Sequence, residues 1–230
     1  MSLSVDEIIA TVRKEGVCCI PDFLTAAELA DARADLDQAC ADLGHGDQEA
    51  GSRARLGGRI LLDYPGLARI YNHPRTIALS AILTEDPAPF LQEIVANRYY
   101  PPVDALEAHL DEGYGLVPAF MRVTWALFLD DTTAESGALQ VSPGTHWRNY
   151  VDENEPDKQP PTDEEIRDAD YRAIELTAGT LVLRASDIWH CVKPIHHLRR
   201  YVTGSYISRT RLTPWFREDI AKQVAERDAT

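Results

Sequence analysis

The sequence predicts an α+β fold in which a helical front half packs against a β-rich rear half. Residues 4–14 and 25–43 carry apolar side chains at helical spacing. From Tyr99 onward, short β-branched and aromatic runs are separated by glycine, proline and aspartate. Such short runs are typical of a sandwich or barrel, and a block of helices followed by a block of strands favours an α+β architecture.

The helical half contains recognisable start and stop signals. Thr25 is placed to cap the second helix, and Glu28, three residues on, completes a capping box. A further helix is expected to begin near Pro74, because proline is favoured in the first turn, and to end before the prolines that follow. The polar stretch 44–55 is expected to form a loop, and segment 90–96 is interpreted as either a helix or a strand.

The β-rich half contains six runs that are expected to form strands, with no internal repeat. They cover residues 119–129, 138–141, 174–176, 180–183, 188–192 and 201–207. A chain of 230 residues can bury a substantial core. We therefore expect one domain over residues 1–230, with a helical front part over about 1–96 and a β core over about 97–210.

One acidic and polar segment, residues 149–172, is inserted into the β-rich half. It is too polar to contribute to a core, and a short helix is expected to begin at Thr162. Loops inserted into a rigid scaffold often serve as lids. A lid and a solvated loop without catalytic duty are both compatible with this sequence.

Composition and charge exclude several classes of function. The formal net charge is −14, so phosphate repulsion opposes nucleic-acid binding, while a cationic substrate such as an aminated sugar or an amino acid is compatible with it. No apolar run approaches the roughly 18–20 residues needed to span a bilayer, and the N-terminus lacks the segments of a secretory signal. We expect a cytoplasmic protein that acts on a small molecule, and its oligomeric state stays open.

Three residues have the composition of a metal site. His109 and Asp111 stand at i and i+2, a spacing that points both side chains the same way in an extended segment. His190 follows 81 residues later, which suits delivery by another strand of a folded-back sheet. Two imidazoles and one carboxylate can cap one face of an octahedral Fe(II), as in the facial triad of non-haem iron oxygenases.

Four other segments carry sequence motifs. They are residues 12–24 (VRKEGVCCIPDFL), 125–131 (WALFLDD), 135–146 (ESGALQVSPGTH) and 178–183 (AGTLVL). In this order they resemble the motifs of phytanoyl-CoA dioxygenase-like enzymes, whose signature ends in Pro-Gly-Ser-His. The resemblance reaches nearly the whole chain, although residues 44–98 and 149–172 carry little of it.

The resemblance implies a double-stranded β-helix (a jelly roll, cupin-like) with the N-terminal helices packed on one sheet. It also implies that the protein uses Fe(II), 2-oxoglutarate and O2, with His109, Asp111 and His190 as the metal ligands. Related halogenases replace the acidic ligand with a small residue so that chloride can bind the iron. The presence of Asp111 therefore favours oxygen chemistry without halide transfer.

The resemblance also implies residues that bind the cosubstrate. Family members anchor the far carboxylate of 2-oxoglutarate with an arginine about ten residues after the distal histidine, and guanidinium suits bidentate binding of a carboxylate. Arg199 and Arg200 both qualify, side-chain alternation lets only one point inward, and the family pattern favours Arg199. Trp125 matches an aromatic position of the cosubstrate pocket, and Asn97 an amide position that bonds the 1-carboxylate. A plain core tryptophan and a strand-edge asparagine are the alternative interpretations.

These observations predict an Fe(II)- and 2-oxoglutarate-dependent oxygenase that oxidises an unactivated C–H of a small-molecule metabolite, with succinate and CO2 as coproducts. Small members of the superfamily commonly tailor natural products, including oligosaccharide antibiotics. Hydroxylation, desaturation and oxidative cyclisation, and a sugar-like substrate, therefore stay open. Two alternatives use the same fold or the same ligands: a non-catalytic jelly-roll protein that binds a small molecule, and a zinc hydrolase.

Overall fold

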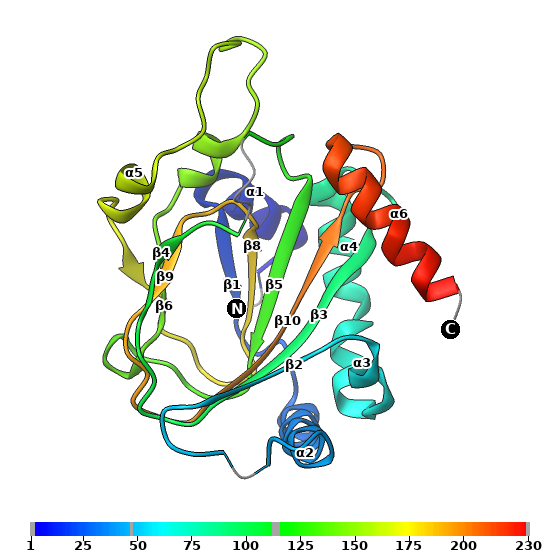
Figure 1. Cartoon of the computed structure of the whole chain (residues 1–230), viewed down its shortest axis with the longest axis vertical. Coiled ribbons are helices and arrows are strands. Elements are labelled where there is room, and N and C mark those ends of the chain that lie inside the picture. The colour runs from blue at the N-terminus through cyan, green and yellow to red at the C-terminus, as the bar shows by residue number, and fades with distance from the viewer. Residues whose placement is uncertain (1–2, 47, 112–115, 229–230) are drawn as a thin grey trace.

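The computed structural model of the protein describes residues 3–46, 48–111 and 116–228. Its framework is two antiparallel β-sheets that face each other, with helices covering the outer face of the larger sheet (Figure 1). This is the jelly-roll arrangement with helices on one sheet that the sequence predicts.

The larger sheet contains six strands of the described chain and the smaller sheet four. In spatial order, the larger sheet is β1 (Val17–Ile20), β8 (Leu181–Ala185), β5 (Arg122–Phe128), β10 (Arg199–Ile207), β3 (Phe90–Tyr99) and β2 (Arg53–Gly57). The smaller sheet is β4 (Leu106–His109), β9 (His190–Val192), β6 (Leu139–Val141) and β7 (Arg172–Ala173). Both sheets combine strands that are distant in the sequence, so each sheet can bring remote side chains together.

Helices from the first third of the chain pack behind the larger sheet (Figure 1). The α-helices are α1 (Val5–Glu15), α2 (Ala26–Asp42), α3 (Pro65–Tyr71), α4 (Pro74–Thr84), α5 (Asp163–Arg167) and α6 (Pro214–Asp228). Short 3₁₀ helices are η1 (Arg59–Asp63), η2 (Ala134–Ser136) and η3 (Thr145–Asn149). Helix α1 contacts β1 and β8, and α4 contacts β5 and β10, so the outer face of the sheet centre is covered. No helix among the described residues is long and apolar enough to cross a membrane.

The core has two apolar layers, one on each face of the larger sheet. Along β5, Trp125 and Leu127 belong to the layer against the helices, whereas Ala126 and Phe128 belong to the layer between the sheets. This alternation follows from the two-residue period of a strand. Burying each large apolar side chain contributes about 1.5–3 kcal/mol, and both layers together hold the sheets in register.

Several predicted elements are confirmed. Thr25 and Glu28 form a reciprocal capping box at the start of α2, and Thr162 starts the short helix α5 in the same way. Helix α4 begins at Pro74. Segment 90–96 is a strand rather than a helix, because β3 pairs with both β10 and β2 inside the larger sheet.

Other predictions are wrong in their boundaries. The part over 1–96 is not only helical, since it supplies β1, β2 and β3 to the larger sheet, and the expected loop up to Arg55 already contains β2. The run 174–176 forms only a single bridge from Leu176 to Thr132, while the strand itself is β7. Strand β4 and helices α3 and α6 were not predicted. In β4, the residues Leu-Glu-Ala-His have no β-branched member, so pairing with β9 decides the structure.

Candidate active site

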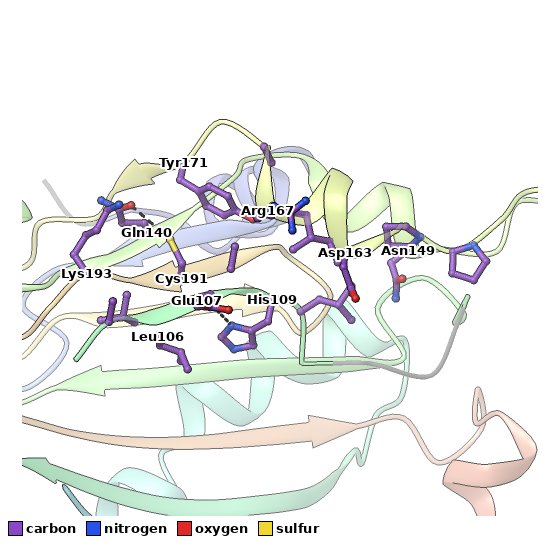
Figure 2. A pocket seen from close by; sticks show the side chains of 18 residues that line it. Leu106, Glu107, His109, Gln140, Asn149, Asp163, Arg167, Tyr171, Cys191 and Lys193 are labelled. Carbon is purple, nitrogen blue, oxygen red and sulfur yellow. Dashed lines mark hydrogen bonds between the residues drawn. The ribbon is translucent and has the colours of Figure 1, made fainter. Parts of the chain in front are cut away.

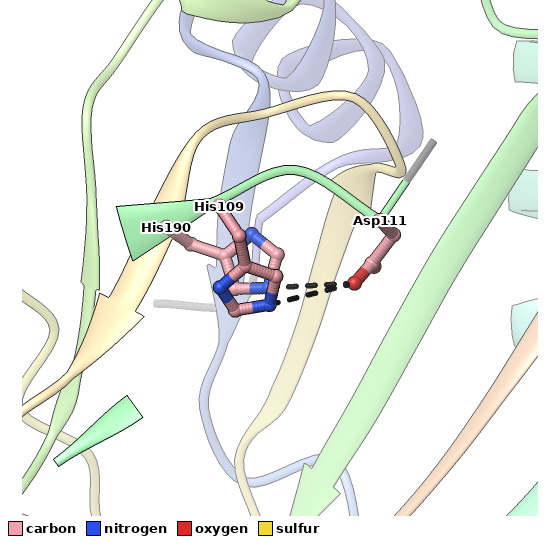
Figure 3. A group of neighbouring side chains, drawn as sticks. All are labelled: His109, Asp111 and His190. Atoms are coloured by element: carbon pink, nitrogen blue, oxygen red, sulfur yellow. Dashed lines mark ion pairs between the residues drawn. The ribbon is translucent and has the colours of Figure 1, made fainter. Parts of the chain in front are cut away.

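The two histidines lie directly opposite each other on neighbouring strands. His109 ends β4 and His190 begins β9, and the antiparallel register pairs these two residues (Figure 3). Their ring centroids are 4.2 Å apart. The strand pairing thus removes the separation of 81 residues along the chain.

Asp111, in the loop after β4, completes the group (Figure 3). Its Oδ1 atom lies 3.9 Å from Nε2 of His109 and 3.6 Å from Nε2 of His190. One ligand atom from each residue lies within 4.8 Å of the other two. Two imidazole nitrogens and a carboxylate oxygen at these separations fit one divalent ion, bound on a single face.

Backbone carbonyls orient both imidazole rings. Nδ1 of His109 lies 2.8 Å from the carbonyl oxygen of Glu107, and Nδ1 of His190 lies 2.9 Å from that of Ile188. A carbonyl only accepts, so each Nδ1 carries the proton and each Nε2 presents its lone pair to the metal position. Burial lowers the pKa of His190 to about 3, with the charge of Arg184 adding to the effect, so this imidazole is neutral at physiological pH.

A residue that sequence reasoning missed holds the carboxylate. Nη2 of Arg184, on β8, donates to Oδ2 of Asp111 at 2.6 Å. Burial by itself would raise the pKa of Asp111, but the charges of Arg184, His190 and Arg122 outweigh it and hold that pKa below its usual range. Oδ2 is thereby occupied while Oδ1 faces the histidines. An arginine at the end of the apolar run 181–183 was the signal that could have revealed this residue.

A cavity of about 540 Å³ between the two sheets contains all three of these residues. Its wall on the larger sheet consists of alternate residues of neighbouring strands, because side chains at i and i+2 share a face. β3 contributes Glu93, Val95, Asn97 and Tyr99; β5 contributes Arg122, Thr124, Ala126 and Phe128; β10 contributes Arg199, Tyr201 and Thr203. The cavity is therefore a product of the strand pattern rather than of loops.

The two candidate arginines of β10 point to opposite faces. Arg199 lines the cavity with 5% of its surface exposed, and its guanidinium carbon lies 5.1 Å from the ring centroid of Phe128 and 5.3 Å from that of Tyr201. Burial lowers its pKa. Arg200 instead binds Asp130 with Nε and Nη2 on the outer face. The alternation leaves Arg199 as the arginine that faces the cavity.

Asn97 also lines this cavity, with 2% of its surface exposed. Trp125 does not. It is fully buried on the other face of β5, with its ring centroid 5.5 Å from that of Tyr71 and Gly204 packed against it. The prediction that Trp125 lines the cosubstrate pocket is therefore corrected to the core interpretation, because the register of β5 turns Thr124 and Ala126 inward instead.

A second, larger cavity of about 1000 Å³ lies on the outer side of the smaller sheet (Figure 2). Helix α5 and neighbouring residues of the insertion, among them Tyr171, line it together with Gln140 and Cys191. Leu106 and His109 border both cavities. The inserted segment 149–172 therefore covers a space next to the metal-ligand group rather than the group itself.

Sequence comparison identifies the family. The sequence profile described as phytanoyl-CoA dioxygenase (PhyH) matches residues 12–196, which is most of the chain. The chain belongs to the phytanoyl-CoA dioxygenase family. It is therefore an enzyme of the non-haem Fe(II)- and 2-oxoglutarate-dependent dioxygenase class. No match was found among curated protein sequences.

Solved structures of low sequence identity share the fold. AviO1 from Streptomyces viridochromogenes Tue57 is 15% identical with a TM-score of 0.73, and the match covers 93% of the enzyme and 99% of AviO1. The α-ketoglutarate-dependent epimerase SnoN from nogalamycin biosynthesis is 19% identical, with a TM-score of 0.69 and coverage of 89% and 83%. HygX from Streptomyces hygroscopicus, with nickel and 2-oxoglutarate bound, is 16% identical, with a TM-score of 0.69 and coverage of 90% and 88%.

Proposed function

We propose that the enzyme uses Fe(II), 2-oxoglutarate and O2 to oxidise a C–H bond of a small-molecule metabolite, with succinate and CO2 as coproducts. One observation carries the proposal. A single cavity contains a complete two-histidine, one-carboxylate group and, on the same wall, the buried guanidinium of Arg199. The first feature suits iron, and the second suits the carboxylate of a 2-oxo acid.

In this proposal, His109, Asp111 and His190 hold the metal through Nε2, Oδ1 and Nε2. When bound, the iron supplies the oxidising chemistry that no amino-acid side chain provides. The protein keeps both imidazoles in the metal-binding tautomer through the carbonyls of Glu107 and Ile188. Because the three ligands share one face, the opposite positions stay open for cosubstrate, dioxygen and water.

Arg199 would bind the far carboxylate of 2-oxoglutarate. Its Nη1 already donates to the carbonyl oxygen of Gly137 at 2.8 Å, but its buried Nε has no hydrogen-bond partner. A buried unsatisfied donor costs about 1–3 kcal/mol, and a carboxylate would remove that cost. The rings of Phe128 and Tyr201 beside it exclude water, which strengthens the charge interaction. Asn97 lines the same space and is available to bind the cosubstrate.

The reaction type is proposed at a coarser level. Hydroxylation and oxidative cyclisation both begin with attack on a C–H bond, and their outcomes differ in how the substrate is held. The structural relatives include an epimerase and a carbocyclase from nogalamycin biosynthesis. Together with the compact size of the chain, this supports a role in natural-product biosynthesis.

The test is anaerobic titration of the metal-free enzyme with Fe(II) and then 2-oxoglutarate. The expected result is the weak visible charge-transfer band of the iron-bound 2-oxo acid. Asp111→Ala should abolish the band, and Arg199→Ala should require at least tenfold more 2-oxoglutarate for the same intensity. Arg200→Gln, one residue away on the outer face, is the matched control and should leave the band unchanged.

Two results would overturn the proposal. Tight binding of zinc with hydrolytic activity and no band would favour a zinc hydrolase. Binding of a small molecule with neither band nor metal would favour a non-catalytic jelly-roll protein. Neither alternative explains why a guanidinium is buried beside the metal-ligand group.

A further inference from the structure

The metal-ligand cavity is positively charged, although the protein as a whole is acidic. Among the described residues that line it, five are arginines and two are carboxylates: Arg53, Arg55, Arg122, Arg184, Arg199, Glu93 and Asp111. The whole chain has a formal net charge of −14. A local excess of arginine inside an acidic protein indicates an anionic ligand rather than general solubility.

The established cofactors do not account for all of these arginines. Arg55 pairs with Glu93 at 3.1 Å, and Arg199 is assigned to the cosubstrate. Arg184 contacts Asp111, but a bound divalent metal would share the charge of that carboxylate. This leaves Arg122 and Arg184 at the same part of the wall, both acting on Asp111 through their charges.

Strand register separates this pair from the cosubstrate arginine. Arg199 begins β10, whereas Ser205 of the same strand lies opposite Thr124, which in turn lies opposite Arg184. Ile207, two residues further, lies opposite Arg122. At about 3.3 Å per residue, the six residues from 199 to 205 span about 20 Å. A five-carbon dicarboxylate held by Arg199 cannot also contact the far end of the cavity.

The guanidinium of Arg184 has a donor directed at no protein group. Its Nη2 binds Asp111, while Nη1 is buried without a hydrogen-bond partner, and the side chain is only 11% exposed. A buried donor of this kind is satisfied by an acceptor that the protein does not supply. Arg122 lines the cavity beside it and adds a second positive charge.

We propose that the primary substrate carries an anionic group, a carboxylate or a sulfate or phosphate ester, that binds Arg184 Nη1 and Arg122 at the end of the cavity away from Arg199. This inference rests on the proposed function and names the substrate class for the same site. It differs from the expectation of a cationic substrate, which was based on the net charge. The acidity belongs to the chain as a whole, whereas the substrate meets the arginines of the cavity.

The experiment compares benzoate with benzamide, which have the same ring and differ in charge. Each probe is added to the anaerobic enzyme loaded with Fe(II) and saturating 2-oxoglutarate, and ligand-observed NMR measures the line broadening that the paramagnetic iron causes. We expect benzoate to bind at least fivefold more tightly than benzamide. Arg122→Gln should remove this preference, Arg122→Lys should restore most of it, and Arg55→Gln, which also removes a cavity arginine, should keep it.

The outcomes separate the two proposals. If the visible band of the iron-bound 2-oxo acid forms but benzoate and benzamide bind equally, or if Arg122→Gln keeps the preference, the anionic-substrate proposal is overturned and Arg184 only positions Asp111. If the band never forms in the wild-type enzyme, the proposed function fails and this inference fails with it. Arg122→Gln should retain the band, because Arg122 is not a metal ligand.

Discussion

At the scale of single residues, the histidines of this protein differ in what surrounds them. His146 ends the Pro-Gly-Thr-His motif, yet it is fully buried away from the metal-ligand group. Its Nε2 donates to the carbonyl oxygen of Arg13 at 3.1 Å, and its ring packs near Phe120 and Tyr150. This histidine joins the turn after β6 to the end of α1, and so has a structural role.

The burial of His146 predicts a specific pH dependence of stability. Burial lowers its pKa to about 4 from the ordinary value near 6.5, so the folded state binds the proton less readily than the unfolded state. Stability is therefore fully present above pH 6.5 and is lost as the pH falls from 6.5 to 4, by about 2–3 kcal/mol for this residue. Urea unfolding of the metal-free protein at pH 7 and pH 4.5 measures the loss.

The control for this prediction is His146→Gln, which cannot be protonated in this range. The variant should be less stable at pH 7, and its stability should fall less steeply toward pH 4.5. Equal slopes for variant and wild type would show that His146 is not the titrating group.

At the scale of elements, strand β10 separates two functions by the direction of successive side chains. Arg199 faces the cavity, while Arg200 faces α2 and binds both Asp130 and Asp37 at 2.8 Å. Arg98 of β3 also binds Asp37. This outer network attaches α2 to the sheet, and the inner face of the same strand is left for binding.

Arg200→Gln should therefore reduce stability without affecting the site. Removing the guanidinium leaves Asp130, whose side chain is 15% exposed, without its main partner. We expect a loss of about 1–3 kcal/mol in the free energy of unfolding, measured by urea denaturation. A loss of 2-oxoglutarate affinity in this variant would mean that Arg200 rather than Arg199 serves the cosubstrate.

The centre of β10 also depends on a glycine. A Cβ atom at Gly204 would lie 2.6 Å from the Trp125 ring and 2.9 Å from the carbonyl oxygen of Glu93. Gly204→Ala should therefore lower the thermal midpoint, with a loss of about 1–3 kcal/mol from overpacking. Gly57→Ala on β2 is the matched control, since its Cβ would meet only the Ile94 carbonyl oxygen at 3.9 Å. Similar losses in the two variants would argue against tight packing at Trp125.

At the scale of the whole molecule, both sheets take strands from the front and the rear of the chain. β1, β2 and β3 come from the first hundred residues and pair with β8 and β10 from the last fifty. Neither half has a complete sheet alone. We therefore expect one cooperative unit over the chain rather than separate helical and β parts.

Ligand binding should stabilise this unit by mass action. Adding Ni(II) and 2-oxoglutarate, each at about 100 times its dissociation constant, should raise the free energy of unfolding by at least about 2.7 kcal/mol and shift a single thermal transition upward. Differential scanning calorimetry measures both the shift and the number of transitions. His109→Ala should remove the shift, and two separate transitions would contradict the single-unit expectation.

The sequence carries different amounts of information about different parts of the site. The metal ligands could be predicted because their residue types are rare in combination and a strand repeats every two residues. Trp125 could not be assigned correctly, because an aromatic residue in an apolar strand fits either face until the register is known. Arg184 gave a signal, a charge at the end of an apolar run, but its partner Asp111 lies 73 residues away.

The strand limits have a similar explanation. β4 is an edge strand with weak intrinsic preference, and it exists because β9 pairs with it. Segment 90–96 was ambiguous because a short apolar run suits a helix or a buried strand, and only its two neighbours in the sheet decide.

The carbonyl groups that orient the two imidazoles have a consequence for how this enzyme can diversify. A carbonyl oxygen is present at positions 107 and 188 whatever side chain stands there, so the tautomers of His109 and His190 do not depend on neighbouring side chains. The cavity wall, in contrast, consists of side chains that point substitutions can exchange one at a time. Evolution can therefore change the compound that is oxidised while the oxidising centre is inherited intact.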